Sequence, residues 1–577
     1  MKKYWILIMG VVCLINLFAQ DKIYIYKPGN SLLGYKVSDI DSIKFLSNAT
    51  VLTIYKADKT TLSMLVSTVD SVKFVTEMNP VYLAPTYSDD YSAISSYANR
   101  SKWNLANLHD PTIAKCGDTY YMYGTDASYG DVLVGYGHFP YKTSKDLVNW
   151  NYAGSAMSNT PPTWVKDSLN AIRSRLGLVS ILAPTYLYWA PTVRKVGNKY
   201  RMYYVIVVNN FILTGKSCSA ANFDGSWSER AFIGMMESTD LATNVWVDKG
   251  YVISSVSDKS TNWYRSSYTG DWNAYFKWNA IDPSLIVTPE GDNWLIYGSW
   301  HSGIPAVKLD SVTGKPYHLN GLSDYGTRIA RRQNSDANRW QAQEGPEIIY
   351  NPKTGYYYLF LAYDELSVAY NTRVCRSKNI TGPFLGYNGT NISLGGDCFP
   401  IITHPYKFNN HSGWVGISHC GVFQNPDTGD WYYCSQARLP ANTNGNAYSN
   451  AIMMGHVRSI QWTADGWPVV MPERYAAVPQ TVIAENDLIG TWEHIVLNYV
   501  YGVQQTSTTL TLRADYVANG AITGNWSYNA TTKILTIGTT KLNVQRELDW
   551  EASPRVPTIV YAGLNSSGRS LWGKKVK

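Results

Sequence analysis

Apolar and polar residues alternate with the two-residue period of a β-strand in five similar stretches of the chain. Each stretch contains a strand, a turn and a second strand, and the turn glycines, such as Gly117 and Gly197, supply the positive φ that a tight hairpin needs. Measured at Pro111, Pro191, Pro283, Pro346 and Gly421, successive stretches lie 80, 92, 63 and 75 residues apart. Their spacing leaves room for a four-stranded unit and a loop, so the pattern predicts an all-β fold with a five-bladed β-propeller over 100–480. A two-sheet sandwich would not explain five similar hairpins.

Two further β regions flank the predicted propeller. In residues 21–80, the segment 23–27 recurs at 52–56 and the segment 41–45 recurs at 70–74, in both cases 29 residues later. This repetition predicts a small duplicated β module, which we interpret as a spacer or assembly element. Residues 485–577 alternate threonine with apolar residues, which predicts a C-terminal antiparallel β domain resembling a barrel.

The first twenty residues have the layout of a secretory signal peptide. Two lysines precede an apolar run over 5–17 and a short segment that ends near Ala19. Val12 stands before Cys13, where a lipoprotein signal needs a small residue, so we expect cleavage near Ala19 and export rather than lipid anchoring. No later apolar run reaches the roughly 18 residues of a membrane-spanning helix. The final compartment stays open between periplasm, cell surface and medium.

Charge and composition argue against a nucleic-acid-binding chain. Only 16% of the residues are charged, whereas aromatic residues make up 14%. The net charge of +7 is spread along the chain, without the clusters of lysine and arginine that neutralise a phosphate backbone. We therefore expect no nucleic-acid partner. The other expectations are the absence of a membrane span, from the apolar runs, and a monomer.

Six cysteines follow the leader, and none of them has the CxxC spacing of a zinc site. They are Cys116, Cys218, Cys375, Cys398, Cys420 and Cys434. In an oxidising compartment this number is compatible with one or two disulfides and equally with buried free thiols. Both interpretations stay open.

The predicted propeller gathers carboxylates on its axis. The innermost strand of every blade lines the central channel, so the residues that begin the repeats converge there. Three repeats begin with an acid, Asp110, Asp282 and Glu344, whereas Ala190 and His419 begin the other two. Glycoside hydrolysis needs one carboxyl group to protonate the departing sugar oxygen and a second to activate water or to attack. The repeats therefore predict a glycosidase site, in which the third acid tunes the proton donor.

The same residues resemble the motifs of the family 43 glycoside hydrolases, and among these the endo-acting α-1,5-L-arabinanases. The resemblance covers about residues 105–475. Its motifs lie at 109–112, 280–283 and 344–346. It implies that Asp110 is the general base, that Glu344 is the general acid and that Asp282 keeps the acid protonated. It also implies an inverting mechanism.

Glu347 competes with Glu344 for the role of the acid. Glu347 lies three residues further along the same predicted strand, so strand alternation turns its side chain to the opposite face. The family motif also places the acid directly before Gly-Pro. We therefore assign the acid to Glu344.

The resemblance implies substrate and metal contacts as well. Trp189 lies in a motif whose tryptophan borders the sugar cleft, and packing between blades is its alternative role. Asn279 and Ser299 are further substrate-binding candidates. For His301 the alternatives are a contact with substrate and a position at the rim of the cleft, and we expect the rim. His419 resembles the histidine that faces a calcium ion on the channel axis through a water-rich shell. Its alternative role is a hydrogen bond near the acids.

The C-terminal domain resembles the extra β domain of some arabinanases, which favours that activity. The sequence therefore predicts an exported endo-arabinanase that cleaves internal α-1,5-L-arabinofuranosidic bonds of pectic arabinan. The alternative among enzymes is an exo-acting α-L-arabinofuranosidase or β-xylosidase, because the loop sequences do not decide between an open groove and a blind pocket. A non-catalytic sugar-binding propeller would lack one of the acids, and a structural adhesin would make them accidental.

Overall fold

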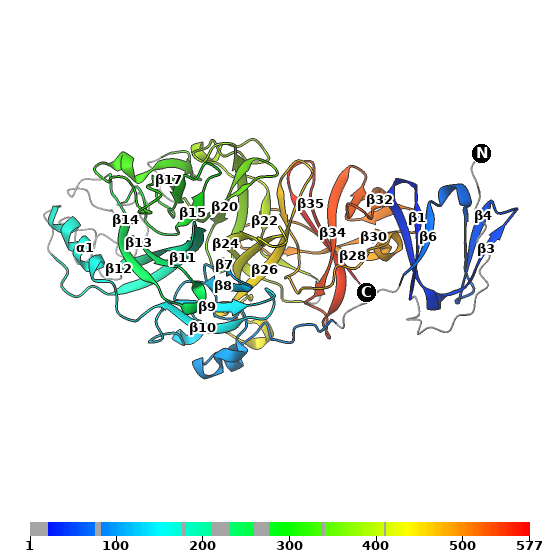
Figure 1. Cartoon of the computed structure of the whole chain (residues 1–577), viewed down its shortest axis with the longest axis horizontal. Helices are drawn as coiled ribbons and strands as arrows, with labels where there is room; N and C mark the ends of the chain where they lie inside the picture. Colours follow the sequence, from blue (N-terminus) through cyan, green and yellow to red (C-terminus); the bar gives the residue numbers. More distant parts are fainter. Residues whose placement is uncertain are drawn as a thin grey trace.

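The computed structural model describes residues 21–75, 82–175, 180–208, 231–258, 276–335, 341–408 and 411–576. Figure 1 shows three parts in a row: a large β domain, a β-barrel and a small N-terminal β module. The chain starts in the module, passes the barrel to build the large domain, and returns to form the barrel. The leader predicted over 1–20 lies outside the described residues.

The large domain contains five four-stranded antiparallel sheets among its described residues. In chain order the sheets comprise β7 (Thr112–Cys116), β8 (Thr119–Tyr123), β9 (His138–Ser144) and β10 (Asn151–Met157); β11 (Tyr186–Val196), β12 (Lys199–Val208), β13 (Ala231–Ser238) and β14 (Val247–Ser254); β15 (Ser284–Val287), β16 (Asn293–Ile296), β17 (Ile304–Leu309) and β18 (Thr327–Ala330); β19 (Gln343–Asn351), β20 (Tyr356–Tyr363), β21 (Asn371–Ser377) and β22 (Ile401–Thr403); and β24 (Val415–Gln424), β25 (Trp431–Arg438), β26 (Met453–Trp462) and β27 (Pro468–Val470). Each hairpin predicted from the sequence forms the first two strands of one sheet.

The five sheets form a closed ring, which is the β-propeller that the sequence predicts. The first strand of each sheet packs against the first strand of the next, from β7 through β11, β15 and β19 to β24, and β24 returns to β7. Tyrosines lie in the second strands or directly after them, and Tyr123, Tyr203, Tyr297 and Tyr363 are fully buried. Each aromatic side chain buries a large apolar area, so these tyrosines fill the spaces between the propeller sheets.

Among the described residues, one helix of more than three turns packs on the propeller. It is α1 (Thr163–Arg175), which lies between the first two sheets in sequence and packs on β14 with Val165 and Leu169 buried. Within the described ranges no helix has the length and apolar character needed to cross a membrane.

The C-terminal domain is a closed antiparallel barrel, as predicted. Its strands are β28 (Gly490–Val496), β30 (Thr508–Leu512), β31 (Val517–Gly520), β32 (Gly524–Asn529), β33 (Ile534–Ile537), β34 (Thr540–Asp549), β35 (Val556–Leu564) and β36 (Ser570–Lys575). The alternate apolar residues point inward, and Trp492, Trp526 and Tyr561 lie in the buried interior. A short helix, α2 (Glu485–Leu488), precedes the barrel.

The N-terminal module is duplicated, and its two repeats exchange strands. The first repeat contains β1 (Lys22–Lys27), β2 (Ser31–Lys36) and β3 (Ile40–Leu46), and the second contains β4 (Val51–Lys56), β5 (Thr61–Leu65) and β6 (Ser71–Val75). The sheets do not follow this division: one has the order β2-β1-β6 and the other β3-β4-β5. Each repeat therefore donates its third strand to the sheet of the other.

The barrel contacts both neighbours. Asn486 of α2 exchanges two hydrogen bonds with the backbone of Gly34 in the module, at 2.9 and 2.6 Å. On the other side, β29 (Gln505–Thr506) pairs in parallel with β23 (Tyr406–Lys407) of the propeller.

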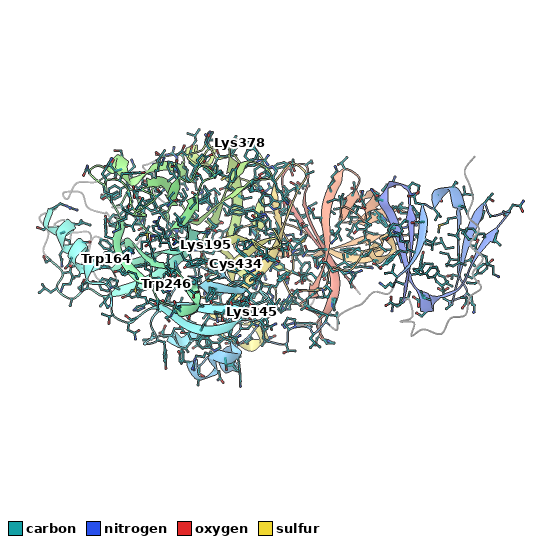
Figure 2. The ribbon with its side chains drawn as sticks, in the orientation of Figure 1. Lys145, Trp164, Lys195, Trp246, Lys378 and Cys434 are labelled. Atoms are coloured by element: carbon teal, nitrogen blue, oxygen red, sulfur yellow. The ribbon has the colours of Figure 1, made fainter. Side chains whose placement is uncertain are left out.

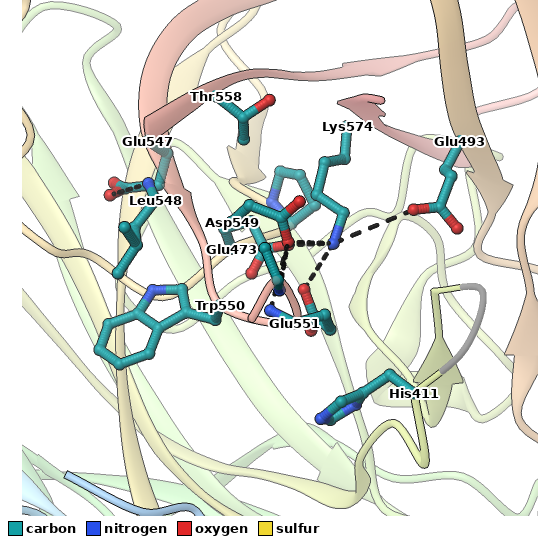
Figure 3. A network of polar contacts seen from close by, with 12 residues as sticks. His411, Glu473, Glu493, Glu547, Leu548, Asp549, Trp550, Glu551, Thr558 and Lys574 are labelled. Carbon is teal, nitrogen blue, oxygen red and sulfur yellow. Dashed lines mark hydrogen bonds and ion pairs between the residues drawn. The ribbon is translucent and has the colours of Figure 1, made fainter. Parts of the chain in front are cut away.

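A buried charge cluster also joins the barrel to the propeller (Figure 3). Nζ of Lys574 lies 3.1 Å from Glu473, 2.9 Å from Asp549 and 2.5 Å from Glu551. Glu473 follows the last propeller strand, whereas the other three residues belong to the barrel domain. We refer to these four residues as the Lys574 cluster. The lysine side chain is 3% exposed, so its charge is neutralised by these acids rather than by water.

The five described cysteines are all free. Four of them are buried, including Cys434, which Figure 2 shows among the strands of the propeller. This favours the free-thiol interpretation for these residues, and Cys218 lies outside the described residues.

Candidate active site

A residue with left-handed backbone lies within the first strand of every sheet or two residues before it. These residues are Asp110, Ala190, Asp282, Gly345 and His419, with φ of 47°, 38°, 55°, 53° and 51°. Left-handed backbone is uncommon outside glycine, and strained residues of this kind gather at functional sites. Its recurrence at one place in all five repeats marks this end of the channel as a constrained site.

The fourth repeat corrects the sequence prediction by one residue. Gly345, and not Glu344, takes the left-handed position, and Glu344 precedes it. A Cβ atom on Gly345 would lie 2.9 Å from Cγ of His419, so glycine is required for the close approach as well as for the φ. The register of β19 shifts between Glu344 and Glu347. Such a bulge re-aims a side chain, which explains how Glu344 reaches the same site from a different position.

Asp110 is a buried carboxylate surrounded by donors. Its Oδ1 lies 2.9 Å from Nδ1 of His419, its Oδ2 lies 3.2 Å from Nδ1 of His109, and Oγ1 of Thr125 donates to Oδ2 at 2.6 Å. Burial alone would raise the pKa of Asp110, but the two histidines outweigh it and hold this pKa well below its usual range. Asp110 is therefore ionised at neutral pH.

Asp282 has the opposite protonation preference. Burial raises its pKa, repulsion from Glu344 and Asp110 adds to the effect, and despite the opposing charge of His419 the pKa reaches about 7. Its Oδ2 accepts the backbone N–H of Gly345 at 3.1 Å. Asp282 thus touches the peptide unit directly after Glu344, and the site contains two aspartates whose environments drive their pKa values apart.

Glu344 is oriented by three side chains. Ser299 Oγ and Trp300 Nε1 donate to its Oε2 at 2.7 and 2.8 Å, and the hydroxyl of Tyr370 bonds to its Oε1. Since a tyrosine hydroxyl can also accept a hydrogen bond, this last contact suits a protonated Glu344 as well as an ionised one. Glu344 remains partly exposed, so it is fixed in position and still accessible.

Glu347 has a structural environment. Its carboxylate forms an ion pair with Arg194 and accepts hydrogen bonds from Ser284 Oγ at 2.7 Å and from the backbone N–H of Val422 at 2.9 Å. These partners come from three other sheets, so Glu347 ties the ring together across the channel. Because its charge is already neutralised, the geometry favours Glu344 as the acid.

Comparison with known proteins decides the family. Residues 105–468 match the family model described as Glycosyl hydrolases family 43, and residues 472–573 match one described as a C-terminal lipocalin-like domain. The chain belongs to glycosyl hydrolases family 43. The family 43 enzyme is accordingly a glycoside hydrolase with an additional C-terminal barrel.

Individual relatives agree with this family. The enzyme is 27% identical to an extracellular endo-α-(1→5)-L-arabinanase of Thermotoga petrophila, over 82% of this chain and 94% of that protein. It is 27% identical to an extracellular exo-α-(1→5)-L-arabinofuranosidase, ArbA, of Cellvibrio japonicus, over 63% of this chain and 86% of that protein. The crystal structure of an endo-1,5-α-L-arabinanase of T. petrophila RKU-1 superposes with a TM-score of 0.60 at 24% identity, over 82% of this chain and 99% of that one, and shares the fold.

The substrate candidates of the family 43 enzyme lie in different environments. Trp189 is partly exposed and packs against the core between the second and third sheets. Asn279 is 4% exposed and accepts a hydrogen bond from Ser255 at 3.1 Å. Ser299 is 1% exposed and bonds to Glu344, so its hydroxyl serves the acid in this structure. His301 is also 1% exposed, so the prediction that it lies at the rim is wrong: the loop after β16 folds it inward, where its ring contacts Phe276.

The surroundings of His419 test whether the enzyme could hold a calcium ion. Calcium takes about six to eight oxygen ligands. Around His419 the described residues do not bring three ligand atoms together, since the set that converges is Glu473, Asp549 and Glu551 of the Lys574 cluster. His419 does have Asp110, Asp282 and Glu344 as charged neighbours. These donors fit a hydrated cation held by one imidazole nitrogen, and they do not form a protein cage.

Several residues of the site lie outside the repeated motifs. Thr125 donates to Asp110 and accepts the N–H of Ala190 at 2.7 Å, and Tyr370 bonds to Glu344. Arg194 neutralises Glu347. Thr125 and Tyr370 lie on loops after second strands, where neither spacing nor motif marks them.

Proposed function

We propose that the family 43 enzyme hydrolyses internal α-1,5 bonds of arabinan with inversion at the anomeric carbon. The supporting observation is the contrast in charge at one end of the channel: Asp110 is kept ionised, Asp282 has its pKa raised to about 7, and Glu344 is held by three donors. The endo-arabinanase relative extends over the barrel as well as the propeller, which supports arabinan as the substrate.

In this proposal each carboxyl group has one task. Asp110 accepts a proton from water as the water attacks the anomeric carbon, and Glu344 donates a proton to the oxygen of the departing sugar. Asp282 positions the Glu344-Gly345 peptide and, because adjacent carboxylates disfavour full ionisation, keeps one proton on the pair. Trp189 offers an apolar ring face on which a furanose can stack.

A calcium ion near His419 is a further part of the proposal. Nδ1 of His419 is engaged by Asp110, so Nε2 would be the ligand, with water completing the shell. A bound calcium ion would offset the negative charge of the three acids. The imidazole of His419 must be neutral to bind calcium. Burial lowers the pKa of His419, but Asp110 and Asp282 outweigh it and raise this pKa to about 10, so calcium binding must displace a proton. Activity measured after chelation and after return of calcium tests this, and unchanged activity in both samples would exclude the ion.

Export completes the proposal. The relatives are named extracellular, and the leader pattern over 1–20 supports secretion. Cell fractionation with N-terminal sequencing checks it: we expect a mature chain that begins near residue 20 outside the cytoplasm, and an uncleaved cytoplasmic chain would contradict it.

The decisive experiment is the time course of products from linear, debranched arabinan. We expect a ladder of oligosaccharides at early times. Arabinose as the sole early product would replace endo action with exo action. Absence of any product, on xylan as well as arabinan, would contradict the proposed activity.

A further inference from the structure

A cavity of about 320 Å³ lies beside the candidate acid, at the border between propeller and barrel. Its walls include Trp300, Arg332, Gln333 and Glu365 of the propeller and Tyr501 of the C-terminal domain. This volume is at the lower end of what small-molecule sites offer, about 300 to 1,000 Å³. We call it the Tyr501 cavity.

One side chain separates the Tyr501 cavity from Glu344. Trp300 lines the cavity, and its indole N–H donates to Oε2 of Glu344 at 2.8 Å. The general acid of a glycosidase faces the oxygen of the departing sugar, so a cavity on the acid's side is placed for the departing part of the chain.

Tyr501 is exposed but carried by an anchored loop. Its side chain is 57% exposed. The loop between β28 and β29 is fixed at one end by the hydrogen bond from Leu497 N to Ser570 O at 2.9 Å, and at the other by that from Gln505 N to Pro405 O at 2.8 Å. Between them, the ring of Tyr499 lies 4.6 Å from the guanidinium of Arg373. An exposed aromatic ring on a loop held at both ends is a preorganised stacking surface, because little entropy is lost when a ligand binds.

The polar groups of the cavity suit a neutral ligand. Arg332 is already paired with Asp364 and lies 3.2 Å from Asp397. Glu365 accepts hydrogen bonds from Ser367 and from the backbone of its own loop. The lining has one cation and two carboxylates, Asp364 and Glu365, so the negative charge left after the Arg332–Asp364 pair disfavours an anion. The aromatic face and the hydrogen-bonding groups match the hydroxyl-rich, apolar-faced surface of a neutral sugar.

We propose that the Tyr501 cavity binds a sugar unit on the departing side of the polysaccharide, with Tyr501 as its stacking residue. The barrel domain then takes part directly in substrate binding. This inference rests on the proposed function, since the ligand is a segment of the same arabinan chain.

The test compares substrates of different length in the full-length enzyme. In Tyr501→Ala, we expect KM for arabinohexaose to rise about threefold to tenfold, the range given by one aromatic stacking contact, with kcat and the KM for arabinotriose nearly unchanged. Tyr501→Phe keeps the ring and should restore the wild-type KM. The matched control is Tyr317→Ala, which removes another exposed tyrosine, on the segment between β17 and β18.

The outcomes separate this inference from the proposed function. If the wild-type enzyme does not cleave arabinan, the proposed function fails first. If it does cleave, an unchanged KM for arabinohexaose in Tyr501→Ala overturns the subsite. An equal loss on both substrates, or a loss that Tyr501→Phe does not restore, overturns it too, because a purely structural role of the loop would act without regard to chain length.

Discussion

The channel end of the propeller and the Lys574 cluster each bring three carboxyl groups together, yet they differ in how the charge is balanced. In the Lys574 cluster a single ammonium group lies within 3.1 Å of Glu473, Asp549 and Glu551. At the channel end the cationic partner is His419, which contacts Asp110 directly, whereas Glu344 is bound by neutral donors. The Lys574 cluster also contains unlike carboxyl groups: burial and Glu551 raise the pKa of Glu473, whereas Lys574 outweighs burial and lowers the pKa of Glu551 to about 2. At the channel end Asp110 is ionised, Asp282 has a pKa of about 7, and Glu344 stays partly exposed.

This difference explains why a cluster of acids is not by itself a catalytic site. In the Lys574 cluster one ammonium group contacts all three acids and joins two domains, so unlike pKa values alone do not mark a catalytic site. At the channel end one pKa lies near 7 and Glu344 is partly exposed, so a proton can be exchanged with a substrate near neutral pH, which is what acid–base catalysis requires. Three experiments test the comparison, in order of decreasing effect.

The largest effect is expected on kcat, for variants of Asp110 and Glu344 at the end of the propeller channel. Asp110→Asn and Glu344→Gln should each lower kcat on linear arabinan by about 10²–10⁴-fold, because each removes one proton-transfer group. Initial rates with purified proteins measure this. Glu347→Gln is the matched control, because Arg194 already neutralises the charge of Glu347. We expect this variant to lose stability and to keep its turnover within tenfold of wild type, which is about 1.4 kcal/mol. Near-wild-type rates in Asp110→Asn or Glu344→Gln would disprove their roles.

Breaking the Lys574 cluster should affect stability and not chemistry. Lys574→Met leaves the buried Glu473 and the partly exposed Asp549 and Glu551 without their cation. Removing one partner of a buried pair costs about 3–5 kcal/mol. Urea denaturation measures the loss, and Lys541→Met, at an exposed position of the barrel, serves as the control. Turnover per folded molecule should stay at the wild-type level. A variant as stable as wild type would show that the cluster does not hold the domains together.

The smallest effect is a pH dependence at Asp282. Its pKa is raised from the ordinary 3.8 to about 7 on folding, so the folded state binds the additional proton between these values. The contribution of Asp282 to stability is therefore fully present below about pH 4 and is lost as the pH rises through 7. Asp282→Asn removes this contribution, so the melting temperature of the variant should gain on wild type by a few degrees from pH 4 to 8. A constant difference between the two proteins over this range would contradict the raised pKa.

Much of the fold follows from the sequence, because antiparallel hairpins are local. Strand alternation and turn glycines mark the five propeller hairpins, and all of them form. The strand exchange of the N-terminal module does not follow, since β3 and β6 would satisfy the same pattern in either sheet. Sequence periodicity fixes which residues lie on a strand face, and it leaves open which partner completes a sheet.

The sequence predicts those site residues that stand at the same position of the propeller repeat, and it does not predict the others. Asp110, Asp282 and His419 stand at one position of the repeat, and the structure brings them together. Glu344 lies one residue away from that position, because Gly345 must leave room for the ring of His419. Tyr370 and Tyr501 reach the region from a loop and from another domain, so only the folded chain brings them near the acid.

The exchanged strands of the N-terminal module have a consequence for how this protein can change over generations. Deleting one repeat would leave the other with a two-stranded hairpin and an orphan third strand, because β6 completes the sheet of β1 and β3 completes the sheet of β4. A two-stranded hairpin alone is marginal in water. We therefore expect homologues to contain both repeats of the module or neither of them.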